Sequence, residues 1–478
     1  MLTRDEFDSY CASNPDAIYA LLVKQHEAIE KLTSTVKQLQ DRLNKDSNNS
    51  SKPPSSDGYK KKPVTLRAKS GNKPGGRKGH PGSGLAFRDN PDHSLVHSPS
   101  SCGKCGTNLS QVSSERIEER QSFDIPPPSK IECTQHQLHW KCCPGCGELC
   151  SPPVPEGVEH RVQYGPRFNA LMLYLSSYMM VPSARVREIA YDLFGVQISE
   201  GTLYNITNRA NDTLAPVEDS IKNALPRQKV VNCDETGARV NGSLHWIHVV
   251  CTRMLTMYSL SKRRGKVAMD DMGILTDLIG RATHDGWKAY FRFACDHALC
   301  NAHHLRELKA LFEQQGQQWA ADMITVLIDI KTAVEKSKSE GQRSIPTTLL
   351  RELEDRYESA LAAGKKANPP PEATGKRGRP GHSVGGNLVR RLDEYRKETL
   401  AFLYDFDVPF DNNQAERDVR MMKVKLKVSG CFRTEKGAKA FCRIRGYVST
   451  MRKQQHNVLA ALHSVCQGTP TPPILEFN

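Results

Sequence analysis

Residues 229–236 read KVVNCDET, an apolar, β-branched run that ends in two adjacent carboxylates. Such a run predicts a buried strand that delivers Asp234 to the edge of a sheet, where ligands can reach it. Glu235 would then face the opposite way, because side chains alternate along a strand. The segments that follow alternate between strand-like and helix-like patterns. The sequence therefore predicts an α/β fold for this part of a multidomain chain.

Three segments downstream extend this predicted sheet. Residues 244–260, LHWIHVVCTRMLTMYSL, indicate two strands around a turn. Residues 274–290, ILTDLIGRATHDGWKAY, indicate a helix followed by a short strand. Residues 291–312, FRFACDHALCNAHHLRELKALF, indicate a strand that runs into a helix. Helical periodicity then dominates up to residue 460, interrupted by the basic Pro/Gly-rich stretch 364–386.

Composition bounds the class of protein. The chain has 478 residues, enough for about three domains, and its 67 Lys and Arg against 53 Asp and Glu give a formal net charge of +14. That excess favours an anionic partner such as nucleic acid. No apolar run reaches the roughly 20 residues that span a membrane. With no signal peptide pattern at the start, we expect a cytoplasmic protein, in which the 15 cysteines stay reduced and clustered ones bind metal.

Residues 1–45 carry the pattern of a coiled-coil helix. Apolar residues recur at alternating steps of three and four over about three heptads, with Gln25 as one polar position. We interpret this seam as a self-association helix; the alternative is an amphipathic helix packed on its own domain. The seam residues are Leu22, Ile29, Leu32, Val36, Leu39 and Leu43.

Residues 46–98 begin as a segment that is poor in apolar residues and rich in Ser, Pro, Gly, Lys and Arg. Such a segment cannot bury enough surface to fold alone, so we expect a disordered basic linker. A flexible basic arm can neutralise DNA phosphates without reading sequence, and the alternative is a solvated linker. The candidate DNA contacts are Lys60, Lys61, Lys62, Arg77 and Lys78.

Residues 99–152 hold two C-x2-C pairs, one at Cys102 and Cys105 and one at Cys143 and Cys146. A strand-like stretch separates them, so the pattern predicts a small zinc-ribbon-like module with four thiolates around one structural Zn²⁺. Reduced, unliganded cysteines are the alternative reading. Three other cysteines could compete as ligands, namely Cys133, Cys142 and Cys150.

Residues 160–215 predict helices arranged like a helix-turn-helix, with a turn at Gly195 and Ser199 as N-cap of the second helix. Ordinary packing of a helix pair is the alternative. Residues 376–380, KRGRP, are similar to an AT-hook core that enters the minor groove, although a solvated basic linker has the same composition.

Three carboxylates could hold the two divalent ions, about 3.5–4 Å apart, that phosphoryl transfer on DNA needs. They are Asp234, Asp285 before a glycine turn, and Glu416, about a turn inside a helix for which Asp411 is the expected N-cap. Carboxylate oxygens suit Mg²⁺ or Mn²⁺. The basic residues that follow the glutamate, and that we expect to contact DNA, are Arg417, Arg420, Lys423 and Lys425.

Other readings of these residues remain open at this point. Asp234 could cap a turn, and Glu416 could pair with Arg420 on a solvated helix. Cys300 and His303 have metal-ligand spacing without a second such pair, and we interpret them as helix packing or as polar groups near DNA. The rivals for the middle carboxylate are Asp270, Asp271, Asp277 and Asp296.

Six motifs, together with the paired C-x2-C, run in order along almost the whole chain: NNSSKPPSSD (48–57), KPGGRKGHPG (73–82), CDETG (233–237), DGWKAY (285–290), CNAHHLR (300–306) and FDNNQAER (410–417). In this combination the sequence resembles the insertion-sequence-sixty-six family of bacterial transposases, in particular its large TnpC-type catalytic protein. The chain departs from the family pattern at Arg77, where glutamine is frequent, and in His304-Leu305-Arg306, where many members are arginine-rich.

The resemblance implies a DDE transposase with an RNase H-like catalytic domain at residues 225–440, a helical insertion at about 305–400, and a C-terminal helix and tail at 441–478. It assigns the metal ligands as Asp234, Asp285 and Glu416. Partners would be element ends, target DNA and two small accessory proteins, with the chain acting as a homo-oligomer at the nucleoid. The alternative is a transposase-derived protein that binds DNA without cutting it.

Overall fold

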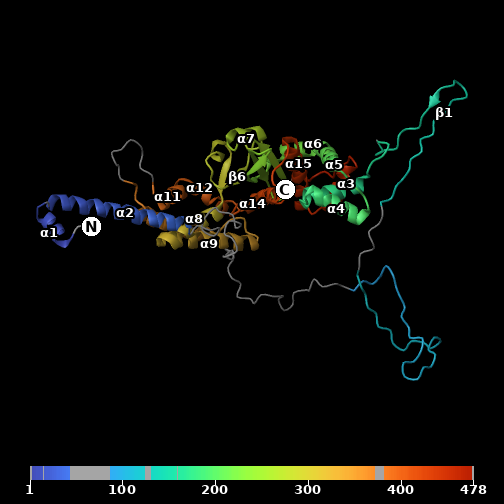
Figure 1. Cartoon of the computed structure of the whole chain (residues 1–478), viewed down its shortest axis with the longest axis horizontal. Coiled ribbons are helices and arrows are strands. Elements are labelled where there is room, and N and C mark those ends of the chain that lie inside the picture. Colours follow the sequence, from blue (N-terminus) through green and yellow to red (C-terminus); the bar gives the residue numbers. More distant parts are fainter. Residues whose placement is uncertain are drawn as a thin grey trace.

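The computed structural model describes residues 3–13, 15–43, 87–123, 131–158, 160–371 and 382–475 of the chain (Figure 1). Within these residues the protein is mixed α/β, with many helices around one mixed sheet. The sheet has five strands in the order β5-β4-β3-β6-β7. Its strands are β3 (Val230–Val240), β4 (Ser243–Cys251), β5 (Thr256–Ser261), β6 (Arg281–His284) and β7 (Asp296–Leu299).

The sheet combines an antiparallel half with a parallel half. β3, β4 and β5 form an antiparallel meander, whereas β6 and β7 run parallel to β3. The β3–β4 hairpin turns at Asn241-Gly242, whose φ angles of 47° and 75° are both positive. Two such residues are what a tight two-residue hairpin turn requires, and Asn-Gly is its preferred pair. Parallel pairing of β3 with β6 covers only Val230 to Asn232.

Most of the strands expected from sequence are confirmed. β4 and β5 are the two strands predicted at 244–260, and β7 runs into helix α8 (Asn301–Gln315) as predicted. The helix expected at the start of 274–290 is wrong. Helix α7 (Lys266–Met272) ends before this segment, with Gly273 as its C-cap. The short strand of the prediction is present as β6, which directly precedes Asp285. The apolar residues from Ile274 to Leu278 pack into the core from a turn, which periodicity alone cannot distinguish from a helix.

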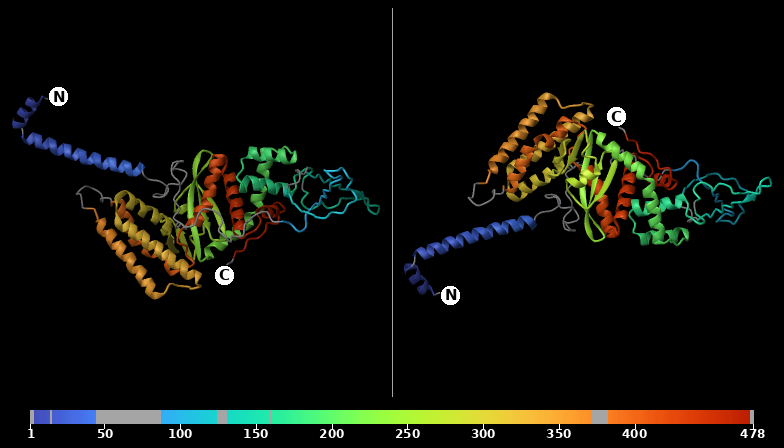
Figure 2. Two further views of the ribbon diagram at one scale, coloured as in Figure 1. Left: turned by 90° about the horizontal axis from the view of Figure 1, so that it is seen from below. Right: turned by 90° about the horizontal axis from the view of Figure 1, so that it is seen from above.

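Helices cover the sheet on both sides (Figure 2). Those between β7 and α14 pack into a hydrophobic core of their own, which meets the sheet at β7. These helices are α8, α9 (Gln318–Ser339), α10 (Thr347–Ala367), α11 (Val384–Glu394), α12 (Arg396–Thr399) and α13 (Ala401–Tyr404). This helical segment separates Asp285 from Glu416 in the chain.

α14 (Asn413–Ser429) packs on β3 and β4, and α15 (Glu435–Lys453) packs on β5. α15 also joins a second core with the preceding helices, so the expected boundary at residue 440 falls inside a helix. The other helices are α3 (Pro166–Leu173), the π-helical η2 (Tyr174–Tyr178), α4 (Ser183–Phe194), α5 (Glu200–Thr213), α6 (Ala215–Ala224) and α16 (Val458–Cys466).

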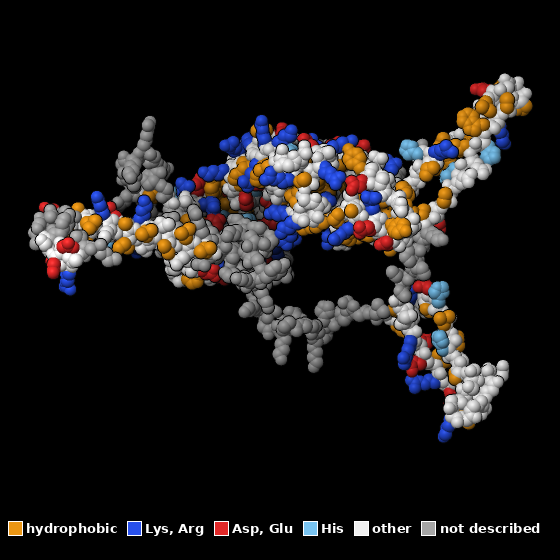
Figure 3. Space-filling model, viewed as in Figure 1, with side chains coloured by type: hydrophobic (Ala, Val, Ile, Leu, Met, Phe, Trp, Pro, Cys, Tyr) orange, Lys and Arg blue, Asp and Glu red, His pale blue; other side chains and the backbone are white. Residues whose placement is uncertain are grey.

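The N-terminal helices lie away from this body. α1 (Arg4–Ser13) and α2 (Pro15–Leu43) extend to one side, and both views of Figure 2 show α2 apart from the sheet. The seam residues of α2 are exposed, from 50% for Val36 and Leu39 to 84% for Leu43, and Figure 3 shows hydrophobic side chains along this helix. In the described part of the chain, the helices are either too short or too polar to cross a membrane.

Candidate active site

Asp234 lies within β3 rather than at its end, which corrects the expectation from KVVNCDET. β3 continues to Val240 because β4 pairs with it along that whole stretch. Pairing with β6 stops at Asn232, so β3 passes Asp234 without a parallel neighbour. The Asp234 Oδ1 accepts the backbone N–H of Glu235 at 2.9 Å. The carboxylate is therefore held by the backbone inside a strand and does not cap a turn.

Asp285 follows β6 directly, at the end of the strand that runs parallel to β3. Asn232 pairs with Thr283, and the two aspartates each lie two residues beyond that pair. Gly286 has a φ of +90°, and the backbone N–H of Trp287 donates to Asp285 Oδ1 at 2.8 Å. The tight turn predicted after Asp285 is therefore present.

The buried side chain of His284 stabilises that turn by a hydrogen bond. His284 Nδ1 accepts the backbone N–H of Gly286 at 3.1 Å, and its Nε2 lies 3.1 Å from His297 Nδ1. Burial, and then the neighbouring His297, lower the pKa of His284 to about 3. The ring is therefore neutral, which lets Nδ1 act as an acceptor. This arrangement fixes the backbone on which Asp285 stands.

Glu416 enters from α14, whose first turn is tied to β3. The N-cap is Asn412 and not Asp411 as expected; Asp411 instead accepts the backbone N–H of Asn413 at 3.0 Å. The buried Asn412 amide donates to the Cys233 carbonyl at 2.7 Å and accepts from Asn232 Nδ2 at 2.9 Å. These bonds hold the helix that carries Glu416 against the strand that carries Asp234.

Asp234 is buried near the other two candidate carboxylates, and these surroundings shift its pKa. The pKa of Asp234 is raised to about 7, first by burial and then by the negative charge of Glu235. Asp285 and Glu416 raise it further, while the bond from the Glu235 backbone N–H opposes the shift. Like charges held together in this way disfavour ionisation unless a cation neutralises them.

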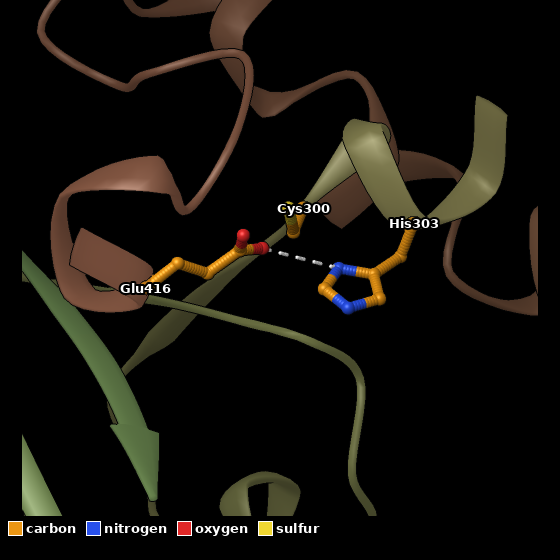
Figure 4. Close-up of side chains that lie close together, drawn as sticks. All are labelled: Cys300, His303 and Glu416. Carbon is orange, nitrogen blue, oxygen red and sulfur yellow. Dashed lines mark ion pairs between the residues drawn. The ribbon is translucent and has the colours of Figure 1, made fainter. Parts of the chain in front are cut away.

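The surroundings of Glu416 differ from the alternative reading, in which it pairs with Arg420 on a solvated helix. Its carboxylate does not pair with Arg420 but faces α8, with Oε1 3.8 Å from His303 Nδ1 (Figure 4). The other oxygen, Oε2, lies 3.8 Å from Arg306 Nη2. Among the described residues, one group of His, Cys, Asp or Glu has ligand atoms all within 4.8 Å of one another, and it consists of Cys300, His303 and Glu416. Asp234 and Asp285 are not part of that group. Cys300 and His303, which the sequence suggested as helix packing or as polar groups near DNA, thus lie beside a candidate catalytic carboxylate.

A cluster around Glu235 escaped the sequence analysis. Its side chain is 2% exposed, accepts two bonds from Arg264 at 2.7 and 3.0 Å, and accepts the Tyr290 hydroxyl at 2.5 Å. The Arg264 guanidinium lies between two indoles, 4.8 Å from the Trp246 ring and 4.3 Å from the Trp287 ring. The cluster therefore links β3, β4 and the loop after Asp285. The adjacent carboxylates in CDET were the only sequence signal for it.

The basic residues after Glu416 divide into two groups. Arg417, Arg420 and Lys423 are exposed and recur at steps of three, so they share one face of α14. Lys425 is half-buried, with its Nζ 3.2 Å from Ser429 Oγ and above the Phe441 ring, and burial lowers its pKa. It is therefore the least suited of the four to meet a phosphate. Outside the described residues lie Lys60, Lys61, Lys62, Arg77, Lys78 and the KRGRP motif.

The two C-x2-C pairs adopt the same local fold. Ser101 bridges Asn108 across the first pair, as β1 (Lys141–Cys142) pairs with β2 (Leu149–Cys150) across the second. In each, the first cysteine N–H donates to the carbonyl five residues on, at 2.9 and 2.8 Å. A glycine with φ near +76° follows each second cysteine, namely Gly106 and Gly147. In register Cys143, not Cys142, matches Cys102.

The pKa values of Cys105 and Cys143 are lowered, but the two turns lie apart. Hydrogen bonds from Thr107 and then Cys102 lower the pKa of Cys105 to about 7, and those from Gly145 and Cys146 lower the pKa of Cys143. Figure 1 shows residues 87–123 and the segment of β1 and β2 as two separate extensions. The four sulfurs do not form a close group in the described structure.

The predicted helix-turn-helix corresponds to α4 and α5. Ser199 is the N-cap of α5 and accepts the Thr202 backbone N–H at 3.0 Å, as expected. Gly195 ends α4 in the left-handed conformation. Both helices contribute to the core that they share with α15 and α16. They therefore have at least a packing role.

A comparison with models of known protein families identifies the family of this chain. The model described as Transposase IS66 family matches residues 161–440, which include all three carboxylates and more than half of the chain. The chain belongs to the Transposase IS66 family. A second model, described as a family of unknown function, matches residues 16–86. No curated protein matches the chain.

Membership of the Transposase IS66 family identifies an enzyme class that processes nucleic acid and binds DNA. The matched residues include the sheet, the helices between β7 and α14, and α14 itself. They leave out α2 and the cysteine pairs, which lie before residue 161.

Proposed function

We propose that the protein is a DDE transposase of a bacterial insertion sequence, with an RNase H-like core built on β3 to β7. The observation that carries this proposal is the approach of Asp285, which follows a strand parallel to β3, and of Glu416 on α14 to the buried Asp234. Burial and then Glu235 raise the pKa of Asp234 to about 7, and the charges of Asp285 and Glu416 raise it further. An antiparallel meander extended by two parallel strands supports the RNase H-like assignment.

The carboxylates suit a pair of hard divalent ions, Mg²⁺ or Mn²⁺. The donors are all oxygen, and Glu416 Oε1 is buried without a hydrogen-bond partner. Such ions, when bound, activate the attacking oxygen and stabilise the leaving oxygen. Asp234, Asp285 and Glu416 would hold them. Asn412 and His284 position these ligands from the second layer, through β3 and the turn after β6.

The reaction would run as two in-line displacements at phosphorus. Water attacks the phosphodiester at each element end and releases a 3′-hydroxyl, which then attacks a phosphodiester of target DNA. Each step forms one P–O bond and breaks one, so no covalent protein–DNA intermediate is needed. Arg417, Arg420 and Lys423 on the exposed face of α14 would hold phosphates near the carboxylates.

The remaining segments would serve assembly and DNA capture. The exposed seam of α2 would pair with a second copy as a coiled coil, since two element ends must be joined. The cysteine turns would bind one structural Zn²⁺ through Cys102, Cys105, Cys143 and Cys146. The basic arm would contact DNA, and accessory proteins of the same element would take part at the nucleoid in the cytoplasm.

A cleavage and joining assay tests this function. Full-length protein with Mg²⁺ or Mn²⁺ is incubated with labelled duplexes that carry the ends of its own element. Wild type should nick and join them, whereas Asp234→Asn and Glu416→Gln should bind DNA without cutting it. Asp271→Asn, an exposed carboxylate of α7, is the matched control and should cut normally.

The outcomes separate the alternatives. Scission by Glu416→Gln at the wild-type rate would refute its role as a metal ligand. Nicking without joined products would indicate a nuclease. Tight binding without scission, even with the accessory proteins added, would favour a binding protein derived from a transposase.

A further inference from the structure

Two helix starts converge beside the carboxylate site. Cys300 is the N-cap of α8, His303 lies in the first turn of that helix, and Glu416 lies in the first turn of α14. Figure 4 shows the three side chains pointing toward one another. The Cys300 sulfur, a His303 ring nitrogen and a Glu416 carboxylate oxygen all lie within 4.8 Å of one another.

Two of these atoms are buried without a hydrogen-bond partner. They are His303 Nδ1 and Glu416 Oε1, which face each other at 3.8 Å. That separation is too long for a hydrogen bond, and Arg306 is equally far from the other carboxylate oxygen. Buried polar atoms are nearly always satisfied in native proteins, so two facing orphans require an explanation. A ligand that bonds to both at once supplies one.

The surrounding backbone fixes the third atom in place. The buried Cys300 sulfur accepts the Asn412 backbone N–H at 3.1 Å, and Asn301 N–H donates to the Phe410 carbonyl at 3.1 Å. These bonds join the start of α8 to the loop before α14. The donor set therefore belongs to a rigid junction and does not depend on a mobile surface loop.

We propose that Cys300, His303 and Glu416 form a binding site for a thiophilic divalent ion of the Zn²⁺ class. One thiolate, one imidazole and one carboxylate are the ligand types that Zn²⁺ takes, and three protein ligands leave a fourth position open. Zinc bonds are about 2.0–2.3 Å long. His303 Nδ1 and Glu416 Oε1 are 3.8 Å apart and the Cys300 sulfur lies within 4.8 Å of the other two ligand atoms, so small movements of the side chains bring all three to an ion. A sulfur ligand disfavours Mg²⁺.

The charges at this site also balance. Binding displaces the Cys300 proton to solvent, because a coordinated thiol is deprotonated outright. The thiolate and the Glu416 carboxylate then neutralise the ion, so Arg306 does not face a net positive charge. The site is separate from the four cysteines of the C-x2-C turns. It shares Glu416 with the proposed catalytic ligands, so Zn²⁺ and Mg²⁺ would compete for this carboxylate.

Zinc binding by the full-length chain tests the proposal. Zinc chloride is titrated against a metal-chelating indicator, and bound metal is counted after dialysis. Wild type should hold one equivalent more than Cys300→Ala, and His303→Gln should weaken this equivalent by at least about tenfold, since even outer-shell changes cost that much. The matched controls are Cys442→Ala, a buried thiol on α15, and His304→Gln, the next residue of α8. Both should bind as wild type does.

Equal zinc stoichiometry and affinity in wild type, Cys300→Ala and His303→Gln would overturn the site. Circular dichroism on each variant shows that the fold is retained, and a thiolate-to-cobalt absorption band lost in Cys300→Ala but not in Cys442→Ala reports the sulfur ligand directly. Asp285→Asn separates this inference from the proposed function. That variant should lose Mg²⁺-dependent cleavage and keep the full zinc stoichiometry.

Discussion

The carboxylate site and the paired cysteines are both candidate metal centres, yet the chain builds them in different ways. Strand register and the buried Asn412 amide bring the carboxylates together from segments up to 180 residues apart. The cysteines are positioned only by local turns, which are exposed and lie on separate extensions. Contacts within the fold therefore position the carboxylates, whereas the two cysteine turns would have to come together to bind one ion.

The largest effect should come from removing a cysteine ligand. Cys143→Ala should release the zinc of the paired turns, because structural zinc contributes about 10–16 kcal/mol of apparent binding free energy. Limited proteolysis should then cut within residues 131–158 while the thermal transition of the sheet stays unchanged. Zinc content and peptide mapping measure both.

Cys142→Ala is the matched control, since Cys142 lies in the paired strand β1 and is out of register with Cys102. It should keep its zinc. Zinc loss in Cys142→Ala, with Cys143→Ala unaffected, would show that the match between the two turns is wrong.

Breaking a buried ion pair behind the carboxylates should have the next largest effect. Lys453 of α15 donates to Asp418 of α14 at 2.7 Å and to the carbonyls of Thr252 and Leu255. Lys453→Met leaves Asp418 buried and unpaired, which typically costs about 3–5 kcal/mol in the free energy of unfolding. Urea unfolding followed by circular dichroism measures the loss.

Lys439→Met is the control, because Lys439 pairs with Glu435 at 3.0 Å on the exposed side of the same helix. Its free energy of unfolding should stay close to that of wild type. If Lys453→Met and Lys439→Met have the same free energy of unfolding, the buried ion pair does not stabilise the fold around the carboxylates. The contrast with the locally folded cysteine turns would then be wrong.

A smaller effect should appear in the pH dependence of stability without metal. The folded-state pKa of Asp234, raised to about 7, lies above its usual 3.8, so the folded protein holds this proton more tightly than the unfolded chain. Its stabilising contribution is complete below about pH 4 and is lost as the pH rises to 7. Asp234→Asn should remove this loss and raise the melting temperature at pH 7 but not at pH 4.

Differential scanning calorimetry in a chelating buffer measures this difference. Asp296→Asn serves as the control, because Asp296 is an exposed residue at the far end of β7. Equal melting temperatures of wild type and Asp234→Asn at both pH values would mean that burial and the neighbouring carboxylates do not raise the pKa of Asp234.

The sequence predicted the local features well and the long-range ones incompletely. KVVNCDET, the strand into α8 and the Ser199 cap follow from periodicity and capping, which act over a few residues. The sequence could not show that β3 continues past Asp234, because that depends on its pairing with β4. Nor could it show that Asn412 rather than Asp411 caps α14, since the choice depends on bonds to β3, about 180 residues away.

The candidate site shows the same division. Asp234, Asp285 and Glu416 were proposed from motifs and resemblance, and the charges of Asp285 and Glu416 add to the rise in the pKa of Asp234 that burial and Glu235 mainly cause. Arg264, by contrast, lies in a basic stretch that looks like a solvated turn. Its place between Trp246 and Trp287 requires three segments to meet, which no local pattern encodes.

The smallest expected effect concerns DNA affinity. Arg420→Ala removes one exposed charge from the face of α14 that follows Glu416, so the slope of log binding constant against log salt should fall by about one. Fluorescence anisotropy with an element-end duplex measures it, with Arg351→Ala, an exposed residue of α10, as the matched control. A reduced slope in Arg420→Ala alone would mean that one helix carries both a metal-ligand candidate and the phosphate contacts. Equal slopes in the two variants would mean that DNA does not contact α14 at Arg420. The basic residues of this helix would then only balance the charge of the carboxylates.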